Sequence, residues 1–141
     1  MVYLEHRIIL IDMQREIKFR VWDHNLKEFI EDSNADPHIC WNGTVYCHER
    51  QKEGGDVLVS GIRNITVQQF TGMKDKNGKE IYEGDIVEGL YKDTDYKHWD
   101  EIKASVVYSD RFAGFSIGCE NWVKQSIEVI GNIFENPELL K

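Results

Sequence analysis

The apolar residues of this chain occur in short clusters, almost all of which end at Gly, Asn or Asp. This pattern limits the possible folds more than any other feature of the sequence. The clusters are rich in β-branched and aromatic residues, which is typical of strands separated by turns. Apolar residues do not recur every three or four positions over a long segment, so long helices are not expected. The sequence therefore predicts a mainly β (all-β) protein.

Strands can be placed where apolar and polar residues alternate. Residues 17–23 alternate cleanly and predict a half-buried strand. Its inward face is expected to carry Ile17, Phe19 and Val21, and its outward face Lys18, Arg20 and Trp22. Further strands are expected at 27–32, on both sides of 42–43, and at 56–62, 65–72, 105–110, 114–119 and 128–135.

Turn residues join these segments. Asn42-Gly43 and Asn77-Gly78 each predict a two-residue hairpin loop, and for the second we expect a type I′ turn. Glu83-Gly84-Asp85 is expected to change the direction of the chain. Asn136-Pro137 predicts an N-cap and one short helical turn. Gly114, Gly118 and Gly131 suit the sharp bends of a small closed barrel.

Composition excludes several classes of function. A net charge of −8 makes broad binding to phosphate backbones, and hence nucleic acid, an unlikely role. The apolar run Ile8–Ile11 is too short for a signal peptide or a membrane span. Cys40, Cys47 and Cys119 are too few for a disulfide framework, which agrees with a reducing compartment. We predict a cytoplasmic protein that needs no cofactor and does not associate with membranes.

Three blocks of sequence resemble the YopX family of small phage and prophage proteins, and they occur in the same order as in that family. They are MQREIKFRVWD (13–23), FTGMKDKNGKEIYEGDIV (70–87) and EVIGNIFENPELL (128–140). The resemblance implies a largely β fold, an SH3-like barrel in the C-terminal half and an origin in a mobile element. It implies no enzymatic mechanism, because the family offers none to transfer to these residues.

The resemblance and the turns together suggest a domain organisation. Residues 1–12 form an N-terminal extension, 13–70 an N-terminal β lobe, 71–87 a connecting hairpin and 84–141 an SH3-like barrel lobe. The segment 34–67 matches no known pattern and is a candidate for specificity. The family pattern begins at Met13.

The beginning of the family pattern at Met13 leads to a first prediction. Deleting residues 1–12 is expected to leave the melting temperature unchanged, because the family-like pattern begins only at Met13. The comparison is between the full chain and a chain that starts at Met13. A loss of several degrees would mean that the extension packs as a structural element, for example Ile8–Ile11 as an edge strand.

A two-residue loop at 42–43 would place His38 opposite Cys47, with Cys40 on the same face. Three such side chains on one face are candidate ligands for a zinc ion. The spacing matches no known zinc finger, however, and buried Cys and His in a sheet account for the same residues. We therefore favour a structural role and expect no bound metal.

Charged residues suggest two other sites. Lys74, Lys76 and Lys79 surround the 77–78 turn and are candidates for a phosphate site, but neighbouring carboxylates favour a solvated hairpin tip. Glu83 and Asp85 form a candidate acid–base pair without a companion His or nucleophile. We expect no enzymatic activity.

Aromatic side chains give the strongest sign of a binding surface, because exposed Trp and Arg are favoured interface anchors. Arg20 and Trp22 are expected on an exposed strand face, and Trp99 in an acidic loop at 92–101. If Trp22 is not exposed, it packs between the two lobes.

These observations favour a non-enzymatic phage accessory protein that self-associates, most simply as a dimer through the poorly protected edges of 17–23 and 65–70. Its partner would be a host protein or a nucleotide-like small ligand, with a role against host defence. The alternative is a nucleic-acid-binding SH3-like module that uses the three lysines with Arg111 and Phe112.

Overall fold

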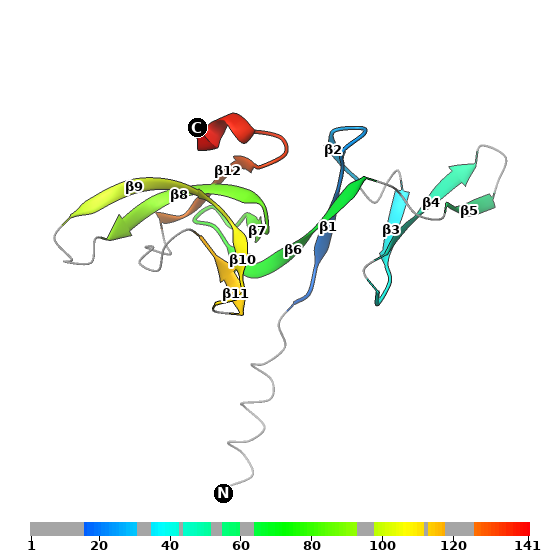
Figure 1. The fold of residues 1–141 in the computed structure, drawn as a ribbon, viewed down its shortest axis with the longest axis horizontal. Helices are drawn as coiled ribbons and strands as arrows, with labels where there is room; N and C mark the ends of the chain where they lie inside the picture. Colours follow the sequence, from blue (N-terminus) through cyan, green and yellow to red (C-terminus); the bar gives the residue numbers. More distant parts are fainter. Residues whose placement is uncertain are drawn as a thin grey trace, which may run out of the picture.

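The computed structural model describes residues 16–30, 35–42, 44–51, 55–59, 64–92, 98–111, 113–117 and 126–141 (Figure 1). Antiparallel strands are the main regular structure of these residues, which confirms the predicted mainly β class. The elements are β1 (Phe19–Asp23), β2 (Glu28–Phe29), β3 (Ala35–Ile39), β4 (Val45–Gln51), β5 (Gly55–Val59), β6 (Ile65–Lys74), β7 (Glu80–Tyr82), β8 (Asp85–Lys92), β9 (Trp99–Ser105), β10 (Val107–Ser109), β11 (Gly114–Ser116), β12 (Glu128–Asn132) and the 3₁₀ helix η2 (Pro137–Leu140).

In the described part of the chain the strands form four sheets, with the orders β2-β1-β6-β7, β12-β8-β9, β10-β11 and β3-β4-β5. The β3-β4-β5 sheet lies at one end of the long axis, and β8 and β9 lie at the other end (Figure 1). The long strand β6 pairs with β1 through its first half and with β7 through its second half. Its register shifts between Phe70 and Lys74, where Gly72 has a φ of 86°. This irregularity lets a single strand serve two partners.

The hydrophobic core lies beneath the C-terminal strands. Five apolar residues are buried together, and Met73, Phe115 and Ile117 pack against them. The five are Ile81, Val87, Val106, Ile127 and Val129. Burial of each side chain of this size stabilises the fold by about 1.5–3 kcal/mol relative to exposure. The core therefore packs β7, β8 and β12 against one another.

The two faces of β1 are largely reversed from the sequence prediction. Ile17 and Phe19, expected inside, are 64% and 45% exposed, although Val21 is buried as expected. Trp22, expected outside, is only 4% exposed. The polar face turns inward at Arg20, whose guanidinium meets the buried carboxylate of Asp85. An ion pair of this kind removes the usual reason for an Arg to face water.

Both Asn-Gly turns differ from the predicted two-residue loops. At the first, the amide of Cys40 donates to the carbonyl of Thr44 at 2.8 Å, which leaves three residues in the loop. At the second, Gly78 has a φ of 84° but Asn77 has no positive φ, so a type I′ turn is excluded. The amide of Gly78 donates to the carbonyl of Asp75 at 3.0 Å. This is a type I turn followed by a left-handed glycine, the usual three-residue hairpin loop.

Three further elements correct or refine the sequence prediction. Trp99 is the first residue of β9, not part of a loop. The 65–70 segment, expected as a poorly protected edge, pairs with β1 through residues 65–69 and meets β7 at Phe70. The short helical turn at 137–140 is confirmed, although the side chain of Asn136 makes no capping hydrogen bond. Among the described residues, no helix is both long and apolar enough to cross a bilayer.

Candidate functional site

A network of polar side chains is buried where β1, β6, β8 and β12 meet. The guanidinium of Arg20 donates to Gln68 Oε1 at 2.9 Å and also to the Asp85 carboxylate. The side-chain amide of Asn132 donates to Gln68 Oε1 at 3.1 Å and to Asp85 Oδ1 at 3.3 Å. Gln68, Asp85 and Asn132 are each at most 2% exposed. Four strands that are distant in sequence are therefore joined by one set of hydrogen bonds.

The surroundings of Arg20 indicate that this network is structural. Its guanidinium carbon lies 4.5 Å from the centre of the Phe29 ring and 4.6 Å from that of Tyr82. The second oxygen of Asp85 accepts the backbone amide of Tyr82 at 2.8 Å. Both carboxylate oxygens are thus engaged, and the carboxylate is out of contact with solvent. In this arrangement the Asp85 carboxylate serves to hold Arg20, Asn132 and the backbone of Tyr82 together.

A second buried carboxylate fastens the 75–79 hairpin loop to β12. Asp75 Oδ1 accepts the amides of Asn77 and Lys79 at 2.8 and 2.9 Å, and Oδ2 accepts the amide of Val129 at 3.1 Å. Burial alone would raise the pKa of Asp75, but the backbone hydrogen bonds from Val129, Lys79 and Asn77 outweigh it and hold this pKa below its ordinary value. The carboxylate therefore stabilises the fold in its charged form.

Replacing Asp75 with Asn is expected to lower the free energy of unfolding by about 2–3 kcal/mol, because an amide loses one acceptor oxygen and the charge that strengthens the other bonds. Since the pKa of the folded state is depressed, the contribution of Asp75 is complete at neutral pH. It is lost as pH falls below about 3.9 towards the lower pKa of the folded protein.

Urea denaturation of both proteins between pH 2 and pH 7 measures this effect. The difference between wild type and Asp75→Asn is expected to shrink at the acidic end. A constant difference at every pH would contradict the assigned role of the charge.

The three lysines of the 74–79 hairpin lie on the surface among carboxylates. Lys76 makes an ion pair with Glu128, and that hydrogen bond raises the pKa of Lys76. Lys74, Lys76 and Lys79 are all exposed. Nearby, Lys18 pairs with Glu80 at 2.6 Å, and this bond lowers the pKa of Glu80. Glu80 also accepts the hydroxyl of Tyr82 at 2.9 Å. Carboxylates thus compensate the positive charge on this side of the molecule.

The candidate metal ligands do not come together as predicted. The register of β3 and β4 pairs His38 with Tyr46 and Pro37 with Cys47, one residue away from the predicted alignment. The longer loop at Trp41 causes this shift. Cys40 is a free cysteine. Within the described ranges, no group of three or more His, Cys, Asp and Glu side chains could hold a metal ion.

The predicted aromatic surface is rearranged. Trp22 stacks on Phe134 with ring centres 5.6 Å apart and meets the edge of Phe29 at 5.0 Å, so it is a core residue and not an exposed anchor. Trp99 remains on the surface with 54% exposure. Arg111 is exposed, and Phe112 lies outside the described residues. In the described part of the chain, the most exposed large apolar side chain is Trp41, at 98%, which the sequence did not single out as a site.

A cavity of about 510 Å³ opens on the β8–β9 sheet. Most of the residues that line it are charged or polar, and these include Lys76, Glu88, Glu101 and Lys103. Leu90 and Ile102 also line it, but Leu90 pairs with Glu101 and Ile102 with Gly89, so the two apolar side chains leave opposite faces of the sheet. The amide of Leu90 donates to Ser126 Oγ at 2.8 Å, which ties this part of β8 to the segment before β12. The volume lies within the usual range for pockets that bind ligands.

Sequence reasoning missed the residues that organise these regions. Gln68, Asp75 and Asn132 are polar residues inside or beside strand patterns, and only their position among inward-facing neighbours could have indicated burial. Trp41 could have been found from its place beside an Asn-Gly turn, because a turn tip projects its side chains into solvent.

Comparison with known proteins decides the family. The model of the YopX protein family matches residues 18–141. The chain belongs to the YopX family. A YopX-family relative, the SPbeta prophage-derived uncharacterized protein YopX of Bacillus subtilis (strain 168), is 30% identical over 131 residues. That alignment covers 87% of this chain and 95% of the relative.

Solved structures agree with the YopX assignment. Protein EF1440 from Enterococcus faecalis has a TM-score of 0.59 and 28% identity, over 91% of this chain and 100% of that one. The crystal structure of yopX from Bacillus subtilis has a TM-score of 0.50 and 25% identity, over 87% of this chain and 95% of that one. These likenesses extend along most of the chain.

Proposed function

We propose that this YopX-family protein is a non-enzymatic prophage accessory protein that self-associates and binds a host protein or a nucleotide-like small ligand in the cytoplasm. The observation that carries this proposal is the contrast between the buried and the exposed groups. The buried carboxylates of Asp85 and Asp75 accept hydrogen bonds that hold the fold together. The exposed groups include large aromatic and aliphatic side chains.

Exposed apolar residues support the binding part of the proposal. Trp41, Trp99 and Phe19 are 98%, 54% and 45% exposed. Aromatic residues of this kind dominate the binding energy of many protein interfaces. The alternative of a nucleic-acid-binding module has weaker support, because Lys76 is already paired with Glu128 and the net charge is −8.

The test combines two measurements on protein purified from a bacterial host. Light scattering at micromolar concentration gives the subunit count, and native mass spectrometry reports any bound ligand or co-purified host protein. A mass above one subunit, with a reproducible bound species, is expected. A strictly monomeric protein that turns over a nucleotide, peptide or ester, and loses this turnover on a single substitution, would refute the proposal.

A further inference from the structure

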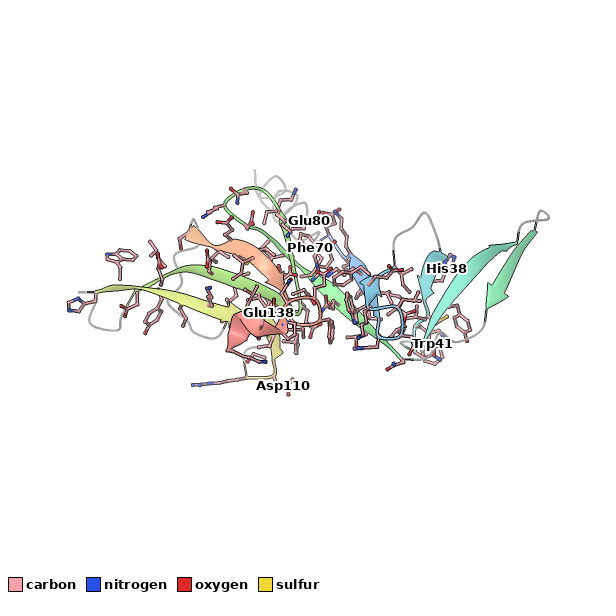
Figure 2. All side chains as sticks on the ribbon, turned by 90° about the horizontal axis from the view of Figure 1, so that it is seen from above. His38, Trp41, Phe70, Glu80, Asp110 and Glu138 are labelled. Atoms are coloured by element: carbon pink, nitrogen blue, oxygen red, sulfur yellow. The ribbon has the colours of Figure 1, made fainter. Side chains whose placement is uncertain are left out.

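A second, smaller cavity lies beside the buried polar network. Its volume is about 150 Å³, and its walls come from β6, the 83–84 turn, the 105–107 segment and residues 133–134 after β12. Side chains crowd this middle part of the molecule, where β1 and β6 meet the C-terminal strands (Figure 2). An apolar cavity of about 150 Å³ holds a single benzene-sized ring. The apolar residues of the wall are Val67, Val106, Val107, Ile133 and Phe134.

One buried donor at this cavity lacks an acceptor. Gln68 is 1% exposed, and its Oε1 accepts hydrogen bonds from Arg20 at 2.9 Å and Asn132 at 3.1 Å. These two donors fix the orientation of the amide, because a flipped amide would place its NH₂ group against both of them. Nε2 therefore faces Gly84, where an added Cβ would lie 2.0 Å from it. Among the described residues, no acceptor lies within hydrogen-bond distance of Nε2.

The neighbouring polar groups of the wall already have partners. The amide of Gly84 donates to the carbonyl of Val106 at 2.8 Å, and the amide of Ile133 donates to the carbonyl of Gly84 at 2.9 Å. The hydroxyl of Thr66 forms a hydrogen bond with His24 Nε2 at 2.8 Å. A buried donor without an acceptor is costly, so a molecule that brings an acceptor to Gln68 Nε2 would recover that cost.

The charge of the wall selects the kind of acceptor. Among the described residues that line the cavity, Glu83 is acidic and none is Lys, Arg or His. A phosphate or carboxylate would therefore be repelled, and a neutral carbonyl oxygen is favoured. The small volume limits the body of the ligand to one ring. Glu83 and Ser105 bring further acceptors to the wall, which suits a ring that carries N–H groups next to its carbonyl.

We propose that this cavity binds a neutral single-ring lactam, the chemical class of the pyrimidine bases, and that Gln68 Nε2 donates to its ring carbonyl. This inference rests on the nucleotide-like ligand included in the proposed function and names the part that is recognised. Val107 is 47% exposed and marks the mouth of the cavity at the surface. A sugar attached to the ring would remain outside this mouth.

Titration of the isotope-labelled protein with uracil, followed by NMR, tests the contact directly. The side-chain NH₂ signal of Gln68 is assigned through its bonds to the backbone. Uracil is expected to move this signal until the cavity is saturated, because the group gains an acceptor. Inorganic phosphate is expected to leave the signal in place.

Two variants and two probes separate the hydrogen bond from the space around it. Gln68→Met removes the NH₂ group and is expected to weaken uracil binding at least about tenfold, but not the binding of benzene, which has no carbonyl. Val107→Trp leaves Gln68 in place and narrows the mouth, so it should weaken the binding of both probes. Leu26→Ala, at a 66% exposed position between β1 and β2, is the matched control and should change neither. Melting curves establish that each variant is folded.

Three results would be decisive. A saturable uracil response that is lost in Val107→Trp and kept in Leu26→Ala supports the site. Benzene binding without a uracil response means an apolar cavity alone and overturns the proposal. A Gln68 signal that responds to neither probe and contacts a slowly exchanging water means that an ordered water is the partner, which also overturns it. A co-purified host protein would leave the proposed function intact in the last two cases, and a monomer that responds to uracil would retain the site without self-association.

Discussion

Replacing Asp85 with Ala will lower the free energy of unfolding by about 3–5 kcal/mol, the range found when one member of a buried ion pair is removed. Asp85 is 1% exposed and accepts hydrogen bonds from Arg20, Asn132 and the backbone of Tyr82. Without it, the Arg20 guanidinium loses this ion-pair partner beside the rings of Phe29 and Tyr82. A loss this large is a substantial fraction of the stability of a small domain.

A double-mutant cycle distinguishes a lost ion pair from a simple cavity. Arg20→Met alone should also be strongly destabilising, because it leaves the Asp85 carboxylate buried without its cation. The double variant, with Met at position 20 and Ala at position 85, should cost clearly less than the sum of the two single changes. Urea denaturation gives all four values. Additive costs would show that Arg20 and Asp85 contribute independently.

Replacing Gly84 with Ala will lower the free energy of unfolding by about 2–5 kcal/mol, from left-handed backbone strain of about 1–2 kcal/mol and overpacking of about 1–3 kcal/mol. Gly84 has a φ of 78°, and an added Cβ would lie 2.0 Å from Gln68 Nε2 and 3.0 Å from Gln68 Cδ. Gln68 cannot move away freely, because its oxygen accepts bonds from Arg20 and Asn132.

Gly78 is the matched control for this substitution. Its φ of 84° imposes a similar backbone strain, but nothing lies within 4 Å of an added Cβ. Gly78→Ala should therefore cost only the strain, about 1–2 kcal/mol. Thermal melting of the two variants side by side measures the difference. Equal losses would mean that Gln68 yields to the new methyl group and that the network is softer than its hydrogen bonds suggest.

The position of strands could be predicted from the sequence, but the inward face of β1 could not. Alternation shows which residues share a face, and both faces of 17–23 carry apolar side chains. The charge of Arg20 suggested solvent, because its partner Asp85 lies 65 residues away and nothing local reveals it. The burial of Trp22 depends on a different long-range contact, its stacking on Phe134.

Turn types and two strands, β8 and β9, were missed for a related reason. Asn-Gly is compatible with both a type I′ turn and a type I turn followed by a left-handed glycine. The choice at 77–78 depends on Asp75, which binds the amides of Asn77 and Lys79 and is itself held by Val129. β9 has a charged, half-exposed sequence, and its strand conformation comes from pairing with β8. The Trp41 loop was misplaced by one residue, which moved the predicted metal ligands apart.

The polar network joins residues that are far apart in sequence, and this separation has a consequence for the order of folding. Arg20 and Asp85 are separated by 65 residues, and Gln68 and Asn132 by 64. Each contact closes a long loop of chain, and chains dominated by such contacts fold slowly. We expect a network that needs several long loops at once to form after the transition state for folding. Substitutions within it should therefore accelerate unfolding and leave the folding rate nearly unchanged, so the network sets the lifetime of the native state.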